Sequence, residues 1–273
     1  TGAEPEWSKD GSEWTYVYED LPKYDGNGVK YIYSVSEDVP SGYELTEQND
    51  TSLTNTQLTD VSVSKIWGTA DGAQIPEYVT VALYRAKDQN GGHMSPVLDG
   101  DGNQITMNLT ADTGWQGTFR DLLKYDPDTG ERYYYGIAEV YVSGGNGETG
   151  SLGDYIVKYN GDEANGFVIT NITPIEISGT KTWIDGSNAS GTRPESIELT
   201  LYRSVAGGAE ETVDAEAVWT KDGDVWTYVY SNLPMTDDEG NIYTYRVEES
   251  QPEAVNGEND TYQMTQNGYD LTN

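Results

Sequence analysis

The chain has 273 residues, enough for two or three domains, and its 47 acidic against 15 basic side chains give a formal net charge of −32. So acidic a chain repels phosphate backbones and anionic membranes, which argues against nucleic acid or lipid as a partner. The absence of cysteine excludes disulfides and a thiol nucleophile, and the single histidine, His93, argues against a histidine-based triad or zinc site.

The first unit in chain order covers residues 1–56. A stretch from Trp7 to Glu37 contains a turn at Asp25–Gly28, which predicts a hairpin, and ends in a Tyr-x-Val-x-Glu strand. The unit closes with a Leu-Thr-Asn strand at Asn55. Two positions of this unit, Glu37 and Asn55, recur in the rest of the chain. The later units add a lysine that has no counterpart here.

The second unit covers residues 57–172. Its first strand places Lys65 two residues ahead of Trp67. A later stretch repeats the pattern of the first unit and ends at Glu139, and the last strand ends at Asn171.

The third unit covers residues 173–273. Lys181 precedes Trp183, the Tyr-x-Val-x-Glu strand ends at Glu249, and the last strand ends at Asn273. The chain therefore contains three copies of one repeat, the first without its opening strands.

All three units alternate apolar and polar residues with period two and are punctuated by Asp-Gly, Asn-Gly and Pro, which is typical of strands and hairpins. About seven short strands per complete unit predict an all-β fold of tandem β-sandwiches. Lys65 follows Asn55 by ten positions, and Lys181 follows Asn171 by ten positions. Because no Gly/Ser-rich linker intervenes, we expect a stiff head-to-tail rod.

The lysine, glutamate and asparagine of each repeat share strand parity with apolar neighbours, so all are predicted to point inward. Buried polar groups cost free energy unless they meet partners, and we expect the three to converge. One interpretation is a buried ion pair with a hydrogen-bonded asparagine. The other, which the recurrence of the whole set favours, is an amide bond between the lysine and asparagine side chains.

Burial favours that bond, because it lowers the pKa of a lysine and raises that of a glutamate. A neutral glutamic acid would hydrogen-bond the asparagine carbonyl and pass protons to the leaving ammonia. No metal or cofactor is needed. The predicted glutamic acids are Glu37, Glu139 and Glu249, and the predicted crosslinking residues are Lys65, Asn171, Lys181, Asn273 and Asn55.

These motifs together resemble the Cna B-type domain of Gram-positive surface proteins and pilins. The matching pieces are Lys-x-Trp, the Leu-Pro-Lys-Tyr-Asp turn at residues 21–25, Tyr-x-Val-x-Glu, and Thr-Asn-Thr at residues 54–56. The resemblance implies immunoglobulin-like (prealbumin-like) sandwiches, spontaneous Lys–Asn isopeptide bonds assisted by a glutamate, and a non-enzymatic stalk or pilus role. It also implies an extracellular position, anchored to the cell wall. The second unit departs from the pattern with Leu122-Leu123 in place of Leu-Pro.

The missing strands of the first unit have two explanations. They lie upstream in a longer protein, or they are supplied by a neighbouring subunit through strand complementation, in which case Asn55 bonds to that neighbour's lysine. The alternative function is a module that binds a host protein or carbohydrate. Its ligand would sit on insertions found only in the second unit, at residues 87–107 and 143–154.

Overall fold

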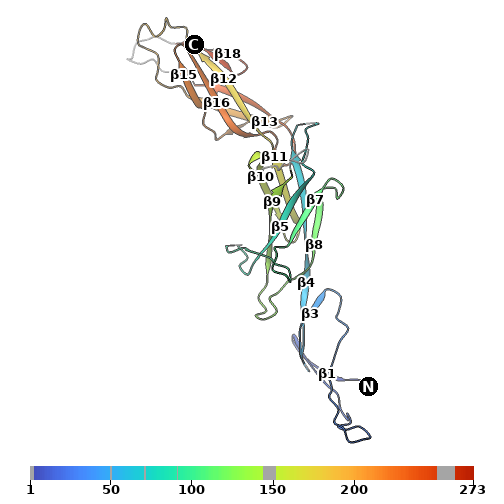
Figure 1. Ribbon diagram of the computed structural model, residues 1–273. Helices are drawn as coiled ribbons and strands as arrows, with labels where there is room; N and C mark the ends of the chain where they lie inside the picture. The colour runs from blue at the N-terminus through green and yellow to red at the C-terminus, as the bar shows by residue number, and fades with distance from the viewer. Residues whose placement is uncertain (1–2, 50, 71, 91, 144–151, 251–261) are drawn as a thin grey trace.

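The computed structural model describes residues 3–49, 51–70, 72–90, 92–143, 152–250 and 262–273. The regular structure in these ranges is β-strand, apart from a one-turn 3-10 helix, η2 (Leu152–Asp154). No helix there is long and apolar enough to cross a membrane. The strands follow one another along an elongated molecule, with the two chain ends at opposite extremes (Figure 1).

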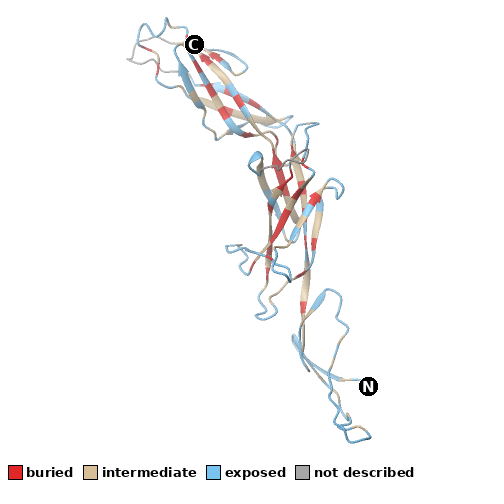
Figure 2. Cartoon of the chain, viewed as in Figure 1, coloured by how far each residue is buried: buried red, intermediate tan, exposed pale blue. Residues whose placement is uncertain are grey.

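The first unit is an open half of a sandwich. Strands β1 (Glu6–Asp10) and β2 (Glu13–Val17) form an isolated hairpin, and β3 (Tyr43–Gln48) pairs with the start of β4 (Leu53–Gly68). Many of its large apolar side chains are exposed, Ile32 to 94%, and the ribbon of this unit is mostly pale blue in Figure 2.

The strand expected to end at Glu37 does not form, since residues 31–40 have no regular structure. The physical reason lies in the third unit, where the equivalent strand β17 (Tyr243–Glu249) pairs along its whole length with β13 (Leu199–Val205). The described part of the first unit contains no strand in the place of β13, so the alternating pattern has no ladder to join.

The second unit is a closed sandwich of two sheets. One sheet has the order β10-β11-β4-β8, and the other is built on β5, which pairs with β6, β7 and β9. The strand bounds are β5 (Tyr78–Ala86), β6 (Ser95–Pro96), β7 (Thr106–Thr110), β8 (Gln116–Leu123), β9 (Tyr134–Val142), β10 (Ile156–Asp162) and β11 (Gly166–Ile172). Its core includes Val61, Val81, Leu109 and Ile169, all fully buried.

The third unit repeats this arrangement. One sheet has the order β15-β16-β12-β19-β18 and the facing sheet the order β14-β13-β17. The remaining bounds are β12 (Pro174–Thr182), β14 (Glu211–Val213), β15 (Val218–Asp222), β16 (Val225–Pro234), β18 (Thr265–Asn267) and β19 (Asp270–Thr272). Tyr228, Tyr230 and Val247 lie at the centre of its core.

The units join without a flexible linker. Strand β4 is continuous from the first unit into the second and contains both Asn55 and Lys65. Between the second and third units only Thr173 separates β11 from β12. The molecule is thus an all-β head-to-tail rod, as the spacing of the repeats predicts.

Candidate crosslinking sites

In the second unit the two sheets bring Lys65, Glu139 and Asn171 together. Lys65 on β4 and Asn171 on β11 belong to neighbouring parallel strands of one sheet, and Glu139 on β9 reaches across from the facing sheet. The Asn171 side chain donates a hydrogen bond from Nδ2 to Glu139 Oε1 at 2.6 Å, and Lys65 Nζ lies 3.9 Å from Glu139 Oε2. All three residues are buried.

The burial of this site favours the neutral form of both ionisable groups. Burial lowers the pKa of Lys65 from the ordinary 10.5 to about 7, against the opposing attraction of Glu139. Burial likewise raises the pKa of Glu139, although the hydrogen bond from Asn171 and the charge of Lys65 act in the other direction. A neutral amine is nucleophilic, and a neutral carboxyl has a proton to give.

The third unit assembles the same three residue types from equivalent strands. Lys181 on β12 donates from Nζ to Glu249 Oε2 at 2.7 Å, and Asn273, directly after β19, donates from Nδ2 to Glu249 Oε1 at 3.0 Å. Burial lowers the pKa of Lys181, whereas the hydrogen bond and charge of Glu249 raise it. The lysine here bonds the carboxyl directly, while Lys65 donates to the backbone oxygen of Ile66 at 2.8 Å.

The amide orientation differs from the expected one at both sites. We expected the glutamic acid to contact the asparagine carbonyl, but the amide nitrogen faces the carboxyl, and the buried Oδ1 atoms of Asn171 and Asn273 have no hydrogen-bond partner. The carboxyl therefore lies beside the group that would leave as ammonia. Half a turn about Cβ–Cγ exchanges the two atoms and brings the carbonyl to the acid.

In the first unit only two of the three residue types meet. Asn55 donates from Nδ2 to Glu37 Oε1 at 2.7 Å, the contact that its two counterparts make, and its Oδ1 is buried without a partner. Both residues are half-buried rather than buried.

The amine of each buried lysine also lies against a tryptophan ring. The sequence did not reveal that these rings enclose the site. Lys65 Nζ is 4.0 Å from the centre of the Trp67 ring, and Trp115 and Tyr155 pack edge-on against that ring at 5.2 and 5.5 Å. In the third unit Trp183 has the same place, 4.8 Å from Lys181 Nζ, packed against its own tryptophan and tyrosine neighbours. The Lys-x-Trp spacing is the signal for this contact, because residues two apart share a strand face.

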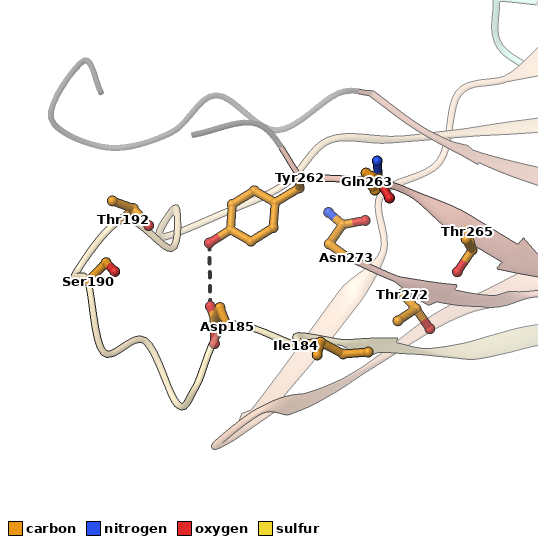
Figure 3. A pocket seen from close by; sticks show the side chains of 9 residues that line it. All are labelled: Ile184, Asp185, Ser190, Thr192, Tyr262, Gln263, Thr265, Thr272 and Asn273. Atoms are coloured by element: carbon orange, nitrogen blue, oxygen red, sulfur yellow. Dashed lines mark hydrogen bonds between the residues drawn. The ribbon is translucent and has the colours of Figure 1, made fainter. Parts of the chain in front are cut away.

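One residue of the site in the third unit, the buried Asn273, borders a pocket. The pocket has a volume of about 480 Å³ and is lined also by Ile184, Thr272 and Tyr262. Figure 3 shows Asn273 beside Tyr262, whose hydroxyl donates to Asp185 Oδ2 at 3.4 Å.

The loops considered for ligand binding in the second unit are described only in part. Residues 91 and 144–151 lie outside the described residues. In the remainder, Met94 and Leu98 are exposed singly, and nothing there forms a built site.

The comparison with family models matches three segments of the chain to the Cna protein B-type domain: residues 3–56, 61–172 and 177–273. Among curated proteins, the chain is 29% identical over 247 residues to the collagen adhesin of Staphylococcus aureus. This match covers 87% of the chain but 18% of the adhesin, so the chain spans less than a fifth of that relative's length.

Several solved structures are similar to this chain, and two of them are described here. Two B repeat units of the Staphylococcus aureus collagen binding protein are 24% identical and have a TM-score of 0.30, with 95% of this chain and 60% of that chain covered. The open conformation of the pilus adhesin SpaC from Lactobacillus rhamnosus GG is 16% identical with a TM-score of 0.36, covering 98% and 36% of the two chains. With TM-scores this low, membership of a family rests on the sequence matches.

Proposed function

Because the chain belongs to the family of Cna protein B-type domains, we propose that it is a stalk or shaft segment of a Gram-positive surface adhesin or pilus, stapled by Lys–Asn isopeptide bonds. Domains of this family are structural repeats of adhesins and not enzymes. The observation that carries the proposal is the repeated buried contact of one lysine, one glutamate and one asparagine in each complete unit.

The proposal divides the chain into two complete domains, 57–172 and 173–273, preceded by the C-terminal part of a third, 1–56. The isopeptide bonds join Lys65 to Asn171 and Lys181 to Asn273. The matched segments and the two separate hydrophobic cores support this division.

The reaction follows from the chemistry of the buried groups. The neutral lysine amine attacks Cγ of the asparagine, the carboxyl of Glu139 or Glu249 carries a proton to Nδ2, and ammonia leaves. The fold holds the two reacting side chains on neighbouring strands, so their reaction is intramolecular. Effective molarities for groups oriented in this way reach about 10⁵–10⁸ M. Each domain reacts once, without turnover.

The bond would serve a mechanical purpose, because it joins the first strand of a domain to the last. Tension that enters at one end of the rod then passes through the crosslink and bypasses the core. We place the chain on the outer surface of the bacterium, attached to the cell wall. Its homologues are surface adhesins, and no cysteine is present to supply disulfides there.

The first experiment is the intact mass of the denatured chain, measured by high-resolution mass spectrometry. We expect a deficit of two ammonia molecules relative to the sequence. Glu139→Gln and Glu249→Gln should each restore one ammonia, because an amide cannot relay the proton although it fills the same volume.

The matched control is Glu248→Gln, since Glu248 neighbours Glu249 on β17 but is exposed and bonds Arg246. It should leave both ammonia losses intact. A full unmodified mass in the parent chain would contradict the proposal and leave the three residues as buried polar networks, which would return the ligand-binding alternative to first place.

A further inference from the structure

One position of the repeat places a polar side chain beside each pair of glutamate and asparagine. It lies on the strand that pairs antiparallel with the asparagine strand, opposite the residue two places before the asparagine. The residues at this position are Gln48 opposite Leu53, Tyr159 opposite Ile169 and Gln266 opposite Leu271. Gln48, Tyr159 and Gln266 are called the bridging residues below.

In the two complete units the bridging residue crosses from one sheet to the backbone of the strand that carries the glutamate. Gln266 Nε2 donates to Val247 O at 2.8 Å, two residues before Glu249. In the second unit the backbone N–H of Glu139 itself donates to the Tyr159 hydroxyl at 3.1 Å. Each contact joins the edge strand of one sheet, β18 or β10, to the edge strand of the other, β17 or β9. An edge strand leaves backbone groups without a ladder partner, and the bridging residue bonds one of them.

The first unit makes the same contact outside any β-ladder. Residues 31–40 have no regular structure, yet Gln48 Nε2 donates to Val35 O at 2.9 Å. Two residues later Glu37 accepts the hydrogen bond from Asn55. The contact between glutamate and asparagine therefore accompanies the bridging contact even where the glutamate segment belongs to no sheet.

The bridge determines how closely the acid of one sheet approaches the asparagine of the other. In the second unit Tyr159 lies opposite Ile169, two residues from Asn171, and its hydroxyl bonds the backbone of Glu139. The Glu139 carboxyl in turn lies 2.6 Å from Asn171 Nδ2. A displacement of about 1 Å between reacting groups can slow a reaction by about 10²-fold.

Burial does not explain the choice of residue at this position. Gln48 and Gln266 are exposed, and Tyr159 is 48% exposed. A side chain that stays in solvent gains little free energy from packing. The feature that the three share is the hydrogen bond to the segment that carries the glutamate.

Resting on the proposed function, we propose that the bridging residues are positioning residues for isopeptide formation. Through one hydrogen bond to the backbone, each holds the glutamic acid at the asparagine amide, and it takes no part in the proton transfer. Tyrosine and glutamine both serve, because the backbone offers an N–H to the hydroxyl and a C=O to the amide. The two residue types are therefore exchangeable at this position.

The test follows bond formation in newly synthesised full chains. Chains from a cell-free translation are sampled into acid over time and digested, and mass spectrometry quantifies the crosslinked peptides of the second and third units separately. Tyr159→Phe keeps the ring without the hydroxyl, and it should slow the bond of the second unit about tenfold while the third unit reacts at the parent rate. Gln266→Met should slow only the third unit.

A rescue variant separates positioning from the filling of space. Tyr159→Gln introduces the residue of the other two units, whose amide can donate to Ile137 O, two residues before Glu139. It should restore most of the rate that Tyr159→Phe loses, although phenylalanine is closer to tyrosine in shape. Tyr125→Phe, which removes a hydroxyl from the turn after β8, is the matched control and should leave both rates unchanged.

The outcomes distinguish this inference from the proposed function. An unchanged rate in the second unit of Tyr159→Phe overturns the inference and leaves the proposed function standing. Equal slowing of both units, or a Tyr159→Gln chain as slow as Tyr159→Phe, also overturns it. Absence of both crosslinked peptides from the parent chain overturns the proposed function and the inference together. A loss confined to one unit and restored by glutamine supports the inference.

Discussion

At the scale of single residues, the buried lysines cost folding free energy unless they react or pair. Lys181 is fully buried, and Lys65 is 5% exposed. A charged amine in such a place loses its hydration, and the nearby carboxyl returns only part of that free energy. Conversion to an amide removes both the charge and the ammonium donors, so the crosslinked product suits the site better than the precursor.

We predict that the Asn171→Ala chain, which keeps Lys65 but has no crosslinking partner for it, becomes more stable as the pH rises above about 7. Between the folded pKa of about 7 and the ordinary 10.5, the unfolded chain holds more protons, so removing protons favours the folded state. The slope for one group is at most about 1.4 kcal/mol per pH unit. Urea unfolding followed by tryptophan fluorescence across this range measures it.

The control for this pH series is the double variant Asn171→Ala with Lys65→Met, which keeps a similar volume without the amine. Its stability should vary less with pH over the same range. Equal slopes in the two chains would show that Lys65 is not the titrating group.

Residue identity and strand parity alone predicted which polar side chains meet, because period two fixes the face on which each lies. The sequence did not predict which amide atom faces the carboxyl, since that depends on rotation about one side-chain bond. It also did not reveal that Lys181 contacts Glu249 directly whereas Lys65 donates to a backbone oxygen. Such differences arise from shifts smaller than any sequence pattern encodes.

At the scale of elements, the arrangement of the first and last strands determines how a domain bears force. In the second unit β4 and β11 are parallel neighbours in register, with Ile169 opposite Lys65 and Asn171 opposite Trp67. A load applied along the chain shears this pair. A covalent bond across the pair resists shear where hydrogen bonds would fail together.

We predict that the parent chain, pulled from its ends in a single-molecule force experiment, shows no unfolding step from the second or third unit. Asn171→Ala should release the segment between Lys65 and Asn171, an extension of about 350 Å at 3.3–3.6 Å per residue. By the chain-entropy estimate for a loop of about 100 residues, the same change should lower the free energy of unfolding by around 4.7 kcal/mol. Asn90→Ala is the control, and a long extension in the parent chain would refute the prediction.

Residues 31–40 show that the formation of a strand depends on more than its own sequence. Tyr33, Val35 and Glu37 alternate as well as their counterparts in β17 do. A strand needs a neighbour to satisfy its backbone hydrogen-bonding groups. The neighbour of β17 is β13, which lies about 45 residues earlier in the chain. Local periodicity predicted the element correctly only where the rest of the sandwich was present.

At the scale of the whole molecule, both joints use the same backbone contact. Lys124 N donates to Gln57 O at 2.8 Å, at the first residue of the second unit, and Met235 N donates to Thr173 O at 3.1 Å, at the first residue of the third. In each case a hairpin turn of the later unit bonds the carbonyl two residues after the asparagine of the earlier one. The backbone of each later unit is therefore paired up to its first residue, which leaves no unpaired linker before it.

The second joint depends on one glycine. A Cβ on Gly68 would lie 2.2 Å from Oγ1 of the fully buried Thr236 in the third unit and 3.0 Å from Cγ1 of Ile172, so a side chain there pushes against both. We predict that Gly68→Val broadens the distribution of distances between the second and third units. Double electron–electron resonance between spin labels attached at Asp112→Cys and Asp214→Cys measures this distribution. Gly100→Val is the matched control, because that glycine has open space around it. Retention of both ammonia losses would show that the domains remain folded, and an unchanged narrow distribution would mean that the Gly68–Thr236 contact does not set the angle of the rod.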